Sequence, residues 1–429
     1  MTFWGNGVLR FRHAAALAVL LFAFAGSIAF TETPLAPSNG FTREGLTKVS
    51  DYLRNEVATG KIPGAVLLIQ QHGQAVLLED FGVLDVVSRR PMMSDAIFRL
   101  YSMSKPVTSV AAMMLVDDGK LSLDDPLSKY IPAFADVKVA VEEREPNGQI
   151  TLATEPLARP ITILDLLRQT SGITYGFYGE SLVRKLYRTS GLFDGDFDNA
   201  QFAERLAKLP LAERPGTLWD YGHSTDILGR VIEVISGKSL YEFEKDQLFD
   251  PLGMTDTAYN IDESKRARAA EALPGDRFPG SLVGLGDPLL RRRWQSGGAG
   301  LVGTIRDYAR FAQMLLNGGT LDGRQYLKRK TVKLMTADHV PAESKVARDH
   351  FYFPSGDSGF GLGFAVRTIG NPPLRAGEYR WDGVGGTFFF IDPRDDMFAI
   401  CMMQSPSQRV RIQDELKRLI YLALEKQAP

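Results

Sequence analysis

The sequence predicts an α/β protein of the α+β type, in which an antiparallel sheet is flanked by helices and joined to a mainly helical domain. Strand-like runs occur near both ends of the chain, whereas the middle has mostly helical periodicity. The 429 residues, 44% of them hydrophobic, can fill one large or two intergrown domains. We expect residues 30–130 with 290–429 to form the sheet domain and residues 131–289 the helical domain.

The first elements are a helix over residues 42–57 and a β-hairpin that starts at Gly64, with its turn at His72-Gly73. If this hairpin joins the late strands in one sheet, the helical middle is an insertion. The resulting crevice would be a usual place for an active site.

A core-facing helix follows, with apolar residues at helical spacing from Val107 to Leu115. Pro106 is tolerated only near a first helical turn, so the helix begins close to Ser102. Asp117-Asp118-Gly119 ends it. Residues 136–160 are polar and predict few strands.

Further helices are predicted at 163–168, 224–236 and 305–317. In the second of these, Ser224 is the expected N-cap and Gly237 closes the helix. The chain then returns to strands at 359–367, 379–383, 386–391 and 397–403, and ends in a helix over 410–424.

The N-terminus has the pattern of a signal peptide over residues 1–29. Arg10 and Arg12 precede an apolar run, and Ser27 and Ala29 suit a cleavage site before Phe30. An uncleaved membrane anchor is the alternative, although the run is short for a span. The sequence thus predicts a secreted or periplasmic protein that keeps no stable membrane anchor after cleavage.

Composition excludes several function classes. The net charge of −1 argues against nucleic-acid and membrane-surface binding. Cys401 is the only cysteine and lies in an apolar strand, which predicts a buried thiol and no internal disulfide. The five histidines form no helical His-x-x-x-His pair, so we expect no metal and no cofactor.

Ser102-Met-Ser-Lys105 carries the chemistry. The two polar side chains are at i and i+3 of the helix start, so they lie on one face. A serine hydroxyl needs a neighbour that takes its proton, and a desolvated lysine can become the neutral amine that does so. This pair suggests acyl transfer through a serine ester, and no Gly-x-Ser-x-Gly elbow offers an α/β-hydrolase alternative.

Two later segments could complete such a site. Tyr221 lies just before the 224–236 helix, and a phenol whose pKa is lowered by a nearby lysine ammonium can shuttle a proton. The glycine-rich stretch 381–386 could direct backbone N–H groups at an oxyanion. Taken alone, each is more typical of a packing tyrosine or a strand bend.

Together these segments resemble the serine β-lactamase and penicillin-binding-protein superfamily, in its class C β-lactamase-like branch, and most closely the family VIII carboxylesterases. The resemblance covers nearly the whole chain after the leader. Besides the segments above, it includes Leu166–Gly172, Pro215-Gly216, Asp226–Gly237, Leu252–Met254 and Gly297–Thr304.

The resemblance implies roles for individual residues. Ser102 would be the acylated nucleophile, Lys105 its activating partner and Tyr221 the proton shuttle. The backbone N–H groups of Ser102 and Val384 would form the oxyanion hole.

Two departures from the family pattern concern substrate binding. The family's Tyr-x-Asn element is Tyr221-Gly-His223 here, so His223 either replaces the asparagine as a donor or only packs. Penicillin-recognising enzymes carry Lys-Thr-Gly or His-x-Gly where this chain has Trp381-Asp382-Gly383. Trp381 provides no cation and Asp382 would repel an anion. This departure favours uncharged acyl or aromatic groups, as in the esterase branch that carries a Trp-x-Gly motif.

The sequence therefore predicts an exported serine hydrolase that cleaves small-molecule carboxylic esters through a Ser102 acyl-enzyme. One alternative is a β-lactamase or a D-alanyl-D-alanine peptidase, with an amide substrate. Another is a catalytically silent cell-wall binding protein, against which the intact Ser102, Lys105 and Tyr221 argue.

Overall fold

The computed structural model describes residues 40–278, 285–340 and 357–424. The predicted signal peptide and its cleavage site lie outside these residues. Over the described ranges, no helix combines the length and the apolar character that crossing a membrane requires.

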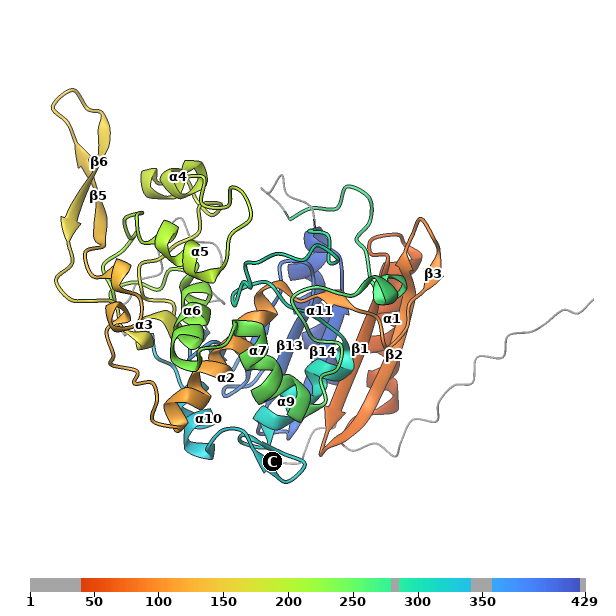
Figure 1. Ribbon diagram of the computed structural model, residues 1–429. Coiled ribbons are helices and arrows are strands. Elements are labelled where there is room, and N and C mark those ends of the chain that lie inside the picture. The colour runs from red at the N-terminus through yellow and green to blue at the C-terminus, as the bar shows by residue number, and fades with distance from the viewer. Residues whose placement is uncertain (1–39, 279–284, 341–356, 425–429) are drawn as a thin grey trace, which may run out of the picture. The chain divides into compact units, whose positions relative to one another are not determined.

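The centre of the fold is an eight-stranded antiparallel sheet with the order β10-β11-β12-β13-β14-β1-β2-β3 (Figure 1). The hairpin of β1 (Gly64–Gln71) and β2 (Gln74–Asp85) turns at His72-Gly73, as predicted, with positive φ angles of 51° and 74°. β1 pairs with β14 (Met397–Met403) from Ala65↔Met403 to Gln71↔Met397. The N-terminal hairpin therefore joins the late strands, and the helical middle is inserted between them.

The remaining strands of this sheet are short. They are β3 (Arg90–Pro91), β10 (Ser358–Phe360), β11 (Ala365–Arg367), β12 (Tyr379–Asp382) and β13 (Phe388–Asp392). The run 359–367, expected as one strand, is two strands. A tight turn separates them, because Gly363 has a φ of 96° and a side chain there would meet Ser109.

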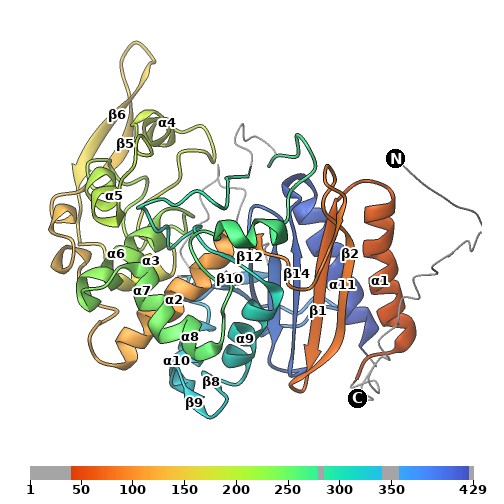
Figure 2. The ribbon, with the colours of Figure 1, turned by 45° about the vertical axis from the view of Figure 1, so that its right-hand side comes forward.

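Helices cover both faces of the sheet, which explains why its central strands are apolar on both sides. Ala65, Leu67 and Ile69 of β1 pack with α1 (Arg43–Ala58) and α11 (Arg409–Ala423). Val66 and Leu68 belong to the core on the other face. Figure 2 shows α1 on the side of β1 away from α9 (Ile305–Leu316). Cys401 is buried in the α1 side of the sheet, as expected.

The middle of the chain is mainly helical. It contains α3 (Ile163–Leu167), α4 (Leu182–Thr189), α5 (Asn199–Leu206), α6 (Ser224–Ser236), α7 (Leu240–Glu244), a π-helical turn (Lys245–Phe249) and α8 (Asp250–Leu252), with α10 (Arg329–Met335) later in the chain. The N-cap of α6 is His223, not Ser224 as expected. The Ser224 side chain is instead hydrogen-bonded to Ser171, 2.8 Å away.

The prediction of few strands over 136–160 is wrong. β5 (Lys138–Arg144) and β6 (Ile150–Pro156) pair along their whole length as an antiparallel hairpin, and Figure 1 shows it away from the main sheet. Its side chains are mostly exposed or half-buried, so its polar composition concealed the strand pattern. The other short pairs are β4 (Phe98–Arg99) with β7 (Val302–Gly303), and β8 (Thr320–Leu321) with β9 (Arg324–Gln325).

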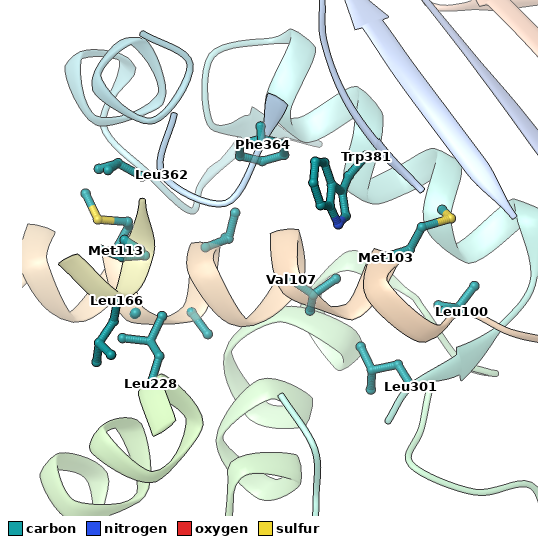
Figure 3. Close-up of a cluster of buried hydrophobic side chains, with 14 of the residues drawn as sticks. Leu100, Met103, Val107, Met113, Leu166, Leu228, Leu301, Leu362, Phe364 and Trp381 are labelled. Atoms are coloured by element: carbon teal, nitrogen blue, oxygen red, sulfur yellow. The ribbon is translucent and has the colours of Figure 1, made fainter. Parts of the chain in front are cut away.

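The helix expected from Ser102 is α2 (Ser104–Asp117), preceded by a 3-10 turn over Tyr101–Met103. It is buried over most of its length, more fully than a one-sided apolar pattern requires. Figure 3 shows Trp381 and Phe364 on one side of this helix, and Leu166 and Leu228 on the other. Burial from both sides holds the start of α2 in a fixed position.

Candidate active site

Ser102 lies in the 3-10 turn at the N-terminal end of α2, with 8% of its surface exposed. The preceding residue, Tyr101, has a φ of 46°, a conformation that side-chain-bearing residues rarely adopt. Such strain persists only where the surroundings enforce it, and it is concentrated at functional sites. Ser102 is thus presented from a constrained turn at the start of α2.

Lys105 reaches Ser102 within the protein interior. Its Nζ is 3.4 Å from the Ser102 Oγ, 3.1 Å from the Tyr175 Oη and 2.8 Å from the Gly298 carbonyl oxygen. A neutral amine has two hydrogens and one lone pair. Donation to Gly298 and Tyr175 leaves that lone pair for the Ser102 hydroxyl proton.

The electrostatics of the site favour this neutral form. Burial lowers the pKa of Lys105 to about 7, although the charges of Asp226 and Asp382 act in the opposite direction. The structure thus agrees with the expectation that desolvation drives the lysine toward the free amine.

Tyr221 is brought to the same place by the loop before α6. Its hydroxyl is hydrogen-bonded to Ser102 and also accepts a hydrogen bond of 3.3 Å from the Trp381 Nε1. The Lys105 Nζ lies 4.4 Å from the centre of the Tyr221 ring, and Trp219 stacks on that ring at 5.9 Å. Ser102, Lys105 and Tyr221 therefore form one buried cluster.

The expectation of a lowered pKa for Tyr221 is wrong. Burial raises the pKa of this phenol well above its usual value, against the opposing effect of its hydrogen bonds to Ser102 and Trp381. A charged lysine would lower the pKa of this phenol, but burial favours the uncharged lysine as well. Tyr221 is thus a protonated group that can donate and accept in turn.

The glycine-rich turn after β12 packs against the segment that leads to Ser102. The Gly383 N–H donates to the Thr387 carbonyl at 2.7 Å, and the Thr387 hydroxyl donates to the Leu100 carbonyl at 3.3 Å. A side chain at Gly383 would come within 2.3 Å of the same Leu100 oxygen. The turn that contains Val384 is therefore held close to the backbone of residues 100–102.

Asp382 is less of a barrier to anions than its charge suggests. Its carboxylate lies 3.3 Å from the Nε of Arg409, at the start of α11, and both side chains are buried. This pairing largely neutralises the negative charge next to Trp381. The sequence could not predict this ion pair, because β13 and β14 separate Asp382 from Arg409 along the chain.

His223 is buried among aromatic rings. Its Nδ1 lies 2.7 Å from a carboxylate oxygen of Asp226, and its ring meets the edge of Tyr175 at 4.4 Å. Asp226 also accepts hydrogen bonds from Ser296 and from the Gly298 N–H. Of the two roles considered for His223, packing and orientation of Asp226 is the one supported by these contacts.

Sequence reasoning missed three groups in this cluster: Tyr175, Asp226 and the Gly298 carbonyl. Asp226 follows His223 by three positions on α6, so helical spacing could have indicated that pair. Tyr175 and Gly298 lie in loops distant in sequence, and only the tertiary fold brings them to Lys105.

Aromatic rings surround these polar groups. The ring centre of Tyr178 lies 6.4 Å from the ring centres of both Tyr221 and Phe278. The half-exposed Phe177 stacks on Tyr175 with 4.7 Å between the ring centres. Such rings offer mainly apolar contacts. Among the described residues, no cluster of His, Cys, Asp or Glu is arranged to hold a metal ion.

Comparison with known proteins identifies the family. Residues 49–422 match the family model described as Beta-lactamase. The chain is 31% identical to the lovastatin esterase of Penicillium rubens, over 81% of this chain and 90% of that protein. It is 28% identical to the esterase EstB of Burkholderia gladioli, over 77% and 83% of the two chains.

Solved structures share the fold. Simvastatin synthase (LovD) from Aspergillus terreus superimposes with a TM-score of 0.73 at 22% identity, over 90% of this chain and all of the other. EstCE1, a hydrolase with promiscuous acyltransferase activity, superimposes with a TM-score of 0.69 at 24% identity, over 89% of this chain and 99% of the other. With the family match over most of its length and these relatives, the chain belongs to the beta-lactamase family and is a serine hydrolase.

Proposed function

We propose that this serine hydrolase is an exported carboxylesterase that acts on small esters with uncharged, apolar acyl groups. The observation that carries the proposal is the position of Trp381. Its indole N–H is bonded to Tyr221, at the place where the resemblance leads one to expect a cation for a substrate carboxylate. The aromatic rings around Tyr221 support the same choice.

Acylation begins with proton transfer from the Ser102 hydroxyl to the neutral Lys105 amine. The Ser102 oxygen attacks the ester carbonyl, and the resulting oxyanion is bound by the backbone N–H groups of Ser102 and Val384. Tyr221 then donates its proton to the departing alkoxide and recovers one from Lys105. The products are the Ser102 acyl-enzyme and the free alcohol.

Deacylation uses the same groups in reverse. A water molecule gives a proton to the Lys105 and Tyr221 pair and attacks the acyl carbon. Collapse of the second tetrahedral intermediate breaks the bond to the Ser102 oxygen, which takes a proton back. The acid is released and both partners return to their starting states.

Two relatives with esterase in their names support this substrate class. A second candidate is hydrolysis of β-lactams or D-alanyl peptides. It is favoured by a similarity to penicillin-binding protein 4 of Amycolatopsis lactamdurans, 30% identical over 78% of this chain and 75% of that protein.

Active-site labelling separates these candidates. Purified protein and its Ser102→Ala variant are treated with a fluorophosphonate probe and with a labelled penicillin, and turnover of p-nitrophenyl esters is measured. We expect fluorophosphonate labelling and ester turnover that both require Ser102. Rapid penicillin turnover with poor ester hydrolysis would support the second candidate, and a wild type that neither reagent labels would remove the acyl-enzyme mechanism.

Export is tested separately. The full chain is expressed in a Gram-negative host, and the N-terminus of the protein recovered from the periplasm is sequenced. The proposal predicts a mature chain that begins at Phe30. Recovery of the uncleaved chain in the membrane fraction would favour the anchor.

A further inference from the structure

Glu244, the last residue of α7, has a carboxyl group that the mechanism does not use. It is fully buried, and a π-helical turn begins at the next residue. Its two hydrogen-bond partners are hydroxyl groups: the Thr108 Oγ1 is 2.9 Å from Oε1, and the Tyr259 Oη is 2.9 Å from Oε2. A buried carboxylate is normally paired with a cation, yet within the described residues this one has no ion pair.

The hydrogens of this network can be counted. Thr108 has a single hydroxyl hydrogen, but its Oγ1 lies within hydrogen-bond distance of both Glu244 and the Gly297 carbonyl, which is 3.0 Å away. If Glu244 were ionised, two acceptors would compete for that hydrogen. A protonated Glu244 resolves the conflict, because it donates to Thr108, Thr108 donates to Gly297, and Tyr259 donates to Glu244.

The network ends next to the nucleophile's base. Gly297 is adjacent to Gly298, whose carbonyl accepts the 2.8 Å hydrogen bond from Lys105. Thr108 is one helical turn beyond Lys105 on α2, so the same helix face carries both residues. The position of the Gly297-Gly298 backbone therefore depends on the Glu244 side chain through one hydroxyl.

We propose that Glu244 is protonated in the folded enzyme and is a positioning residue, which holds the Gly297-Gly298 backbone so that Lys105 is oriented toward Ser102. This inference rests on the proposed role of Lys105 as the base. Burial raises the pKa of Glu244 to about 8, against smaller lowering effects of Thr108 and Tyr259. The neutral form of Glu244 thus predominates near pH 7, where Lys105 loses its proton.

Other titratable groups on the elements around Glu244 are directed to different partners. Asp226 on α6 is bonded to His223, and Glu233 on the same helix is bonded to Arg230. Lys245 and Asp246 in the π-helical turn pair with Asp250 and Lys238. Lys105 itself is shared among Ser102, Tyr175 and Gly298.

The first experiment measures protonation without relying on activity. Urea unfolding of the wild type and of Glu244→Gln is compared between pH 5 and pH 9. A carboxyl group that stays protonated in the folded protein lowers the stability as the pH rises above the pKa of that group in the unfolded chain. Glutamine does not titrate, so the variant has no such loss. Between pH 5 and pH 9, the unfolding constant of the wild type should therefore rise by roughly a hundredfold or more relative to that of Glu244→Gln. A ratio independent of pH would overturn the protonated state.

Glu242→Gln is the matched control, because it removes the same charge from an exposed position of the same helix. It should not reproduce the gain in stability of Glu244→Gln above pH 7. An equal gain would show that the effect comes from net charge alone and would contradict the proposal.

The second experiment measures positioning. Glu244→Leu and Thr108→Val remove the network, and each should lower kcat by about tenfold or more with KM changed less than twofold. Glu244→Gln keeps a neutral donor and acceptor, so it should retain most of kcat and the same acid limb of the pH profile. Thr108→Val preserves the side-chain shape and therefore serves if Glu244→Leu does not fold. Full kcat in the folded variants would overturn the positioning role.

These experiments test the role of Glu244 even if the protein does not hydrolyse esters. The unfolding experiment requires no substrate, and fluorophosphonate labelling of Ser102 can replace kcat as the measure of nucleophile activation. Loss of ester turnover in every variant, including wild type, would therefore count against the substrate class and not against Glu244.

Discussion

The indole N–H of Trp381 lies 3.3 Å from the hydroxyl of Tyr221 and donates to it. A residue that the sequence suggested only for substrate binding therefore also contacts the proposed proton shuttle. The hydrogen bond stabilises the phenol oxygen whenever it carries negative charge, and it orients the hydroxyl toward Ser102. Under the proposed function, substrate choice and proton transfer are thus coupled at this position.

Trp381→Phe should lower kcat for a p-nitrophenyl ester by about fivefold, since it removes one hydrogen bond worth about 1 kcal/mol. KM should change little, because the aromatic surface remains. Trp219→Phe is the control, as it keeps a ring stacked on Tyr221 and leaves the Trp381 bond intact. Equal losses in both variants would mean that packing, not the hydrogen bond, affects Tyr221.

The rate should depend on pH through Lys105. The pKa of this buried lysine is lowered to about 7, so below that value it binds a proton and cannot accept one from Ser102. We expect kcat/KM to fall about tenfold per pH unit on the acid side, with the limb centred near pH 7. The rate of fluorophosphonate labelling, followed over the same range, should show the same limb.

The same shift affects stability with a definite sign. Between pH 7 and the usual lysine value of 10.5, the unfolded chain holds a proton on this lysine that the folded chain lacks. Stability attributable to Lys105 should therefore rise with pH across that interval. Lys105→Met should flatten this part of the urea-unfolding profile, and an unchanged slope would contradict the neutral amine.

His223→Ala should reduce stability more than catalysis. The substitution leaves a cavity among aromatic rings and removes a partner of the buried Asp226, for an expected loss of about 2–4 kcal/mol in the free energy of unfolding. We expect kcat and KM to stay within about threefold of wild type, measured at 15 °C with folded protein. A large increase in KM with little loss of stability would instead assign His223 to substrate binding.

Gly383→Ala should disrupt the turn beside the nucleophile. The added carbon would lie 2.3 Å from the Leu100 carbonyl oxygen, so the backbone that carries Val384 must move. Since loss of an oxyanion donor costs about a hundredfold or more, kcat should fall by at least that factor. Gly370→Ala is the control, because its nearest new contact is an ordinary 3.5 Å; a similar loss there would point to general destabilisation.

Much of the fold could be predicted because its signals are local. The helix start at Ser102, the hairpin at His72-Gly73 and the apolar strand with Cys401 each depend on residues within a few positions. The β5–β6 hairpin was missed since its strands are polar and mostly exposed, so no apolar face marked them. The division of 359–367 into two strands depends on the close approach of Gly363 to Ser109. This contact joins distant segments of the chain, so the sequence pattern did not indicate it.

The candidate site divides in the same way. Ser102 and Lys105 are neighbours on one helix, and Tyr221 and Trp381 were found through their order along the chain. The partners of Lys105 in the loops at Tyr175 and Gly298 could not be found, because their relation to Lys105 exists only in the folded chain. The pKa of Tyr221 was misjudged for a related reason, since burial is a property of the fold.

The pairing of β1 with β14 determines when the nucleophile can become active during folding. β1 pairs with residues as late in the chain as Met403. The late segment also brings Trp381 to Tyr221 and Gly383 to the backbone at Leu100. Contacts of such high sequence separation form slowly. Ser102 is therefore synthesised early, but its site is completed only by the last strands. A nascent chain that ends before β12 contains Ser102 and Lys105 and lacks the later residues that complete the site.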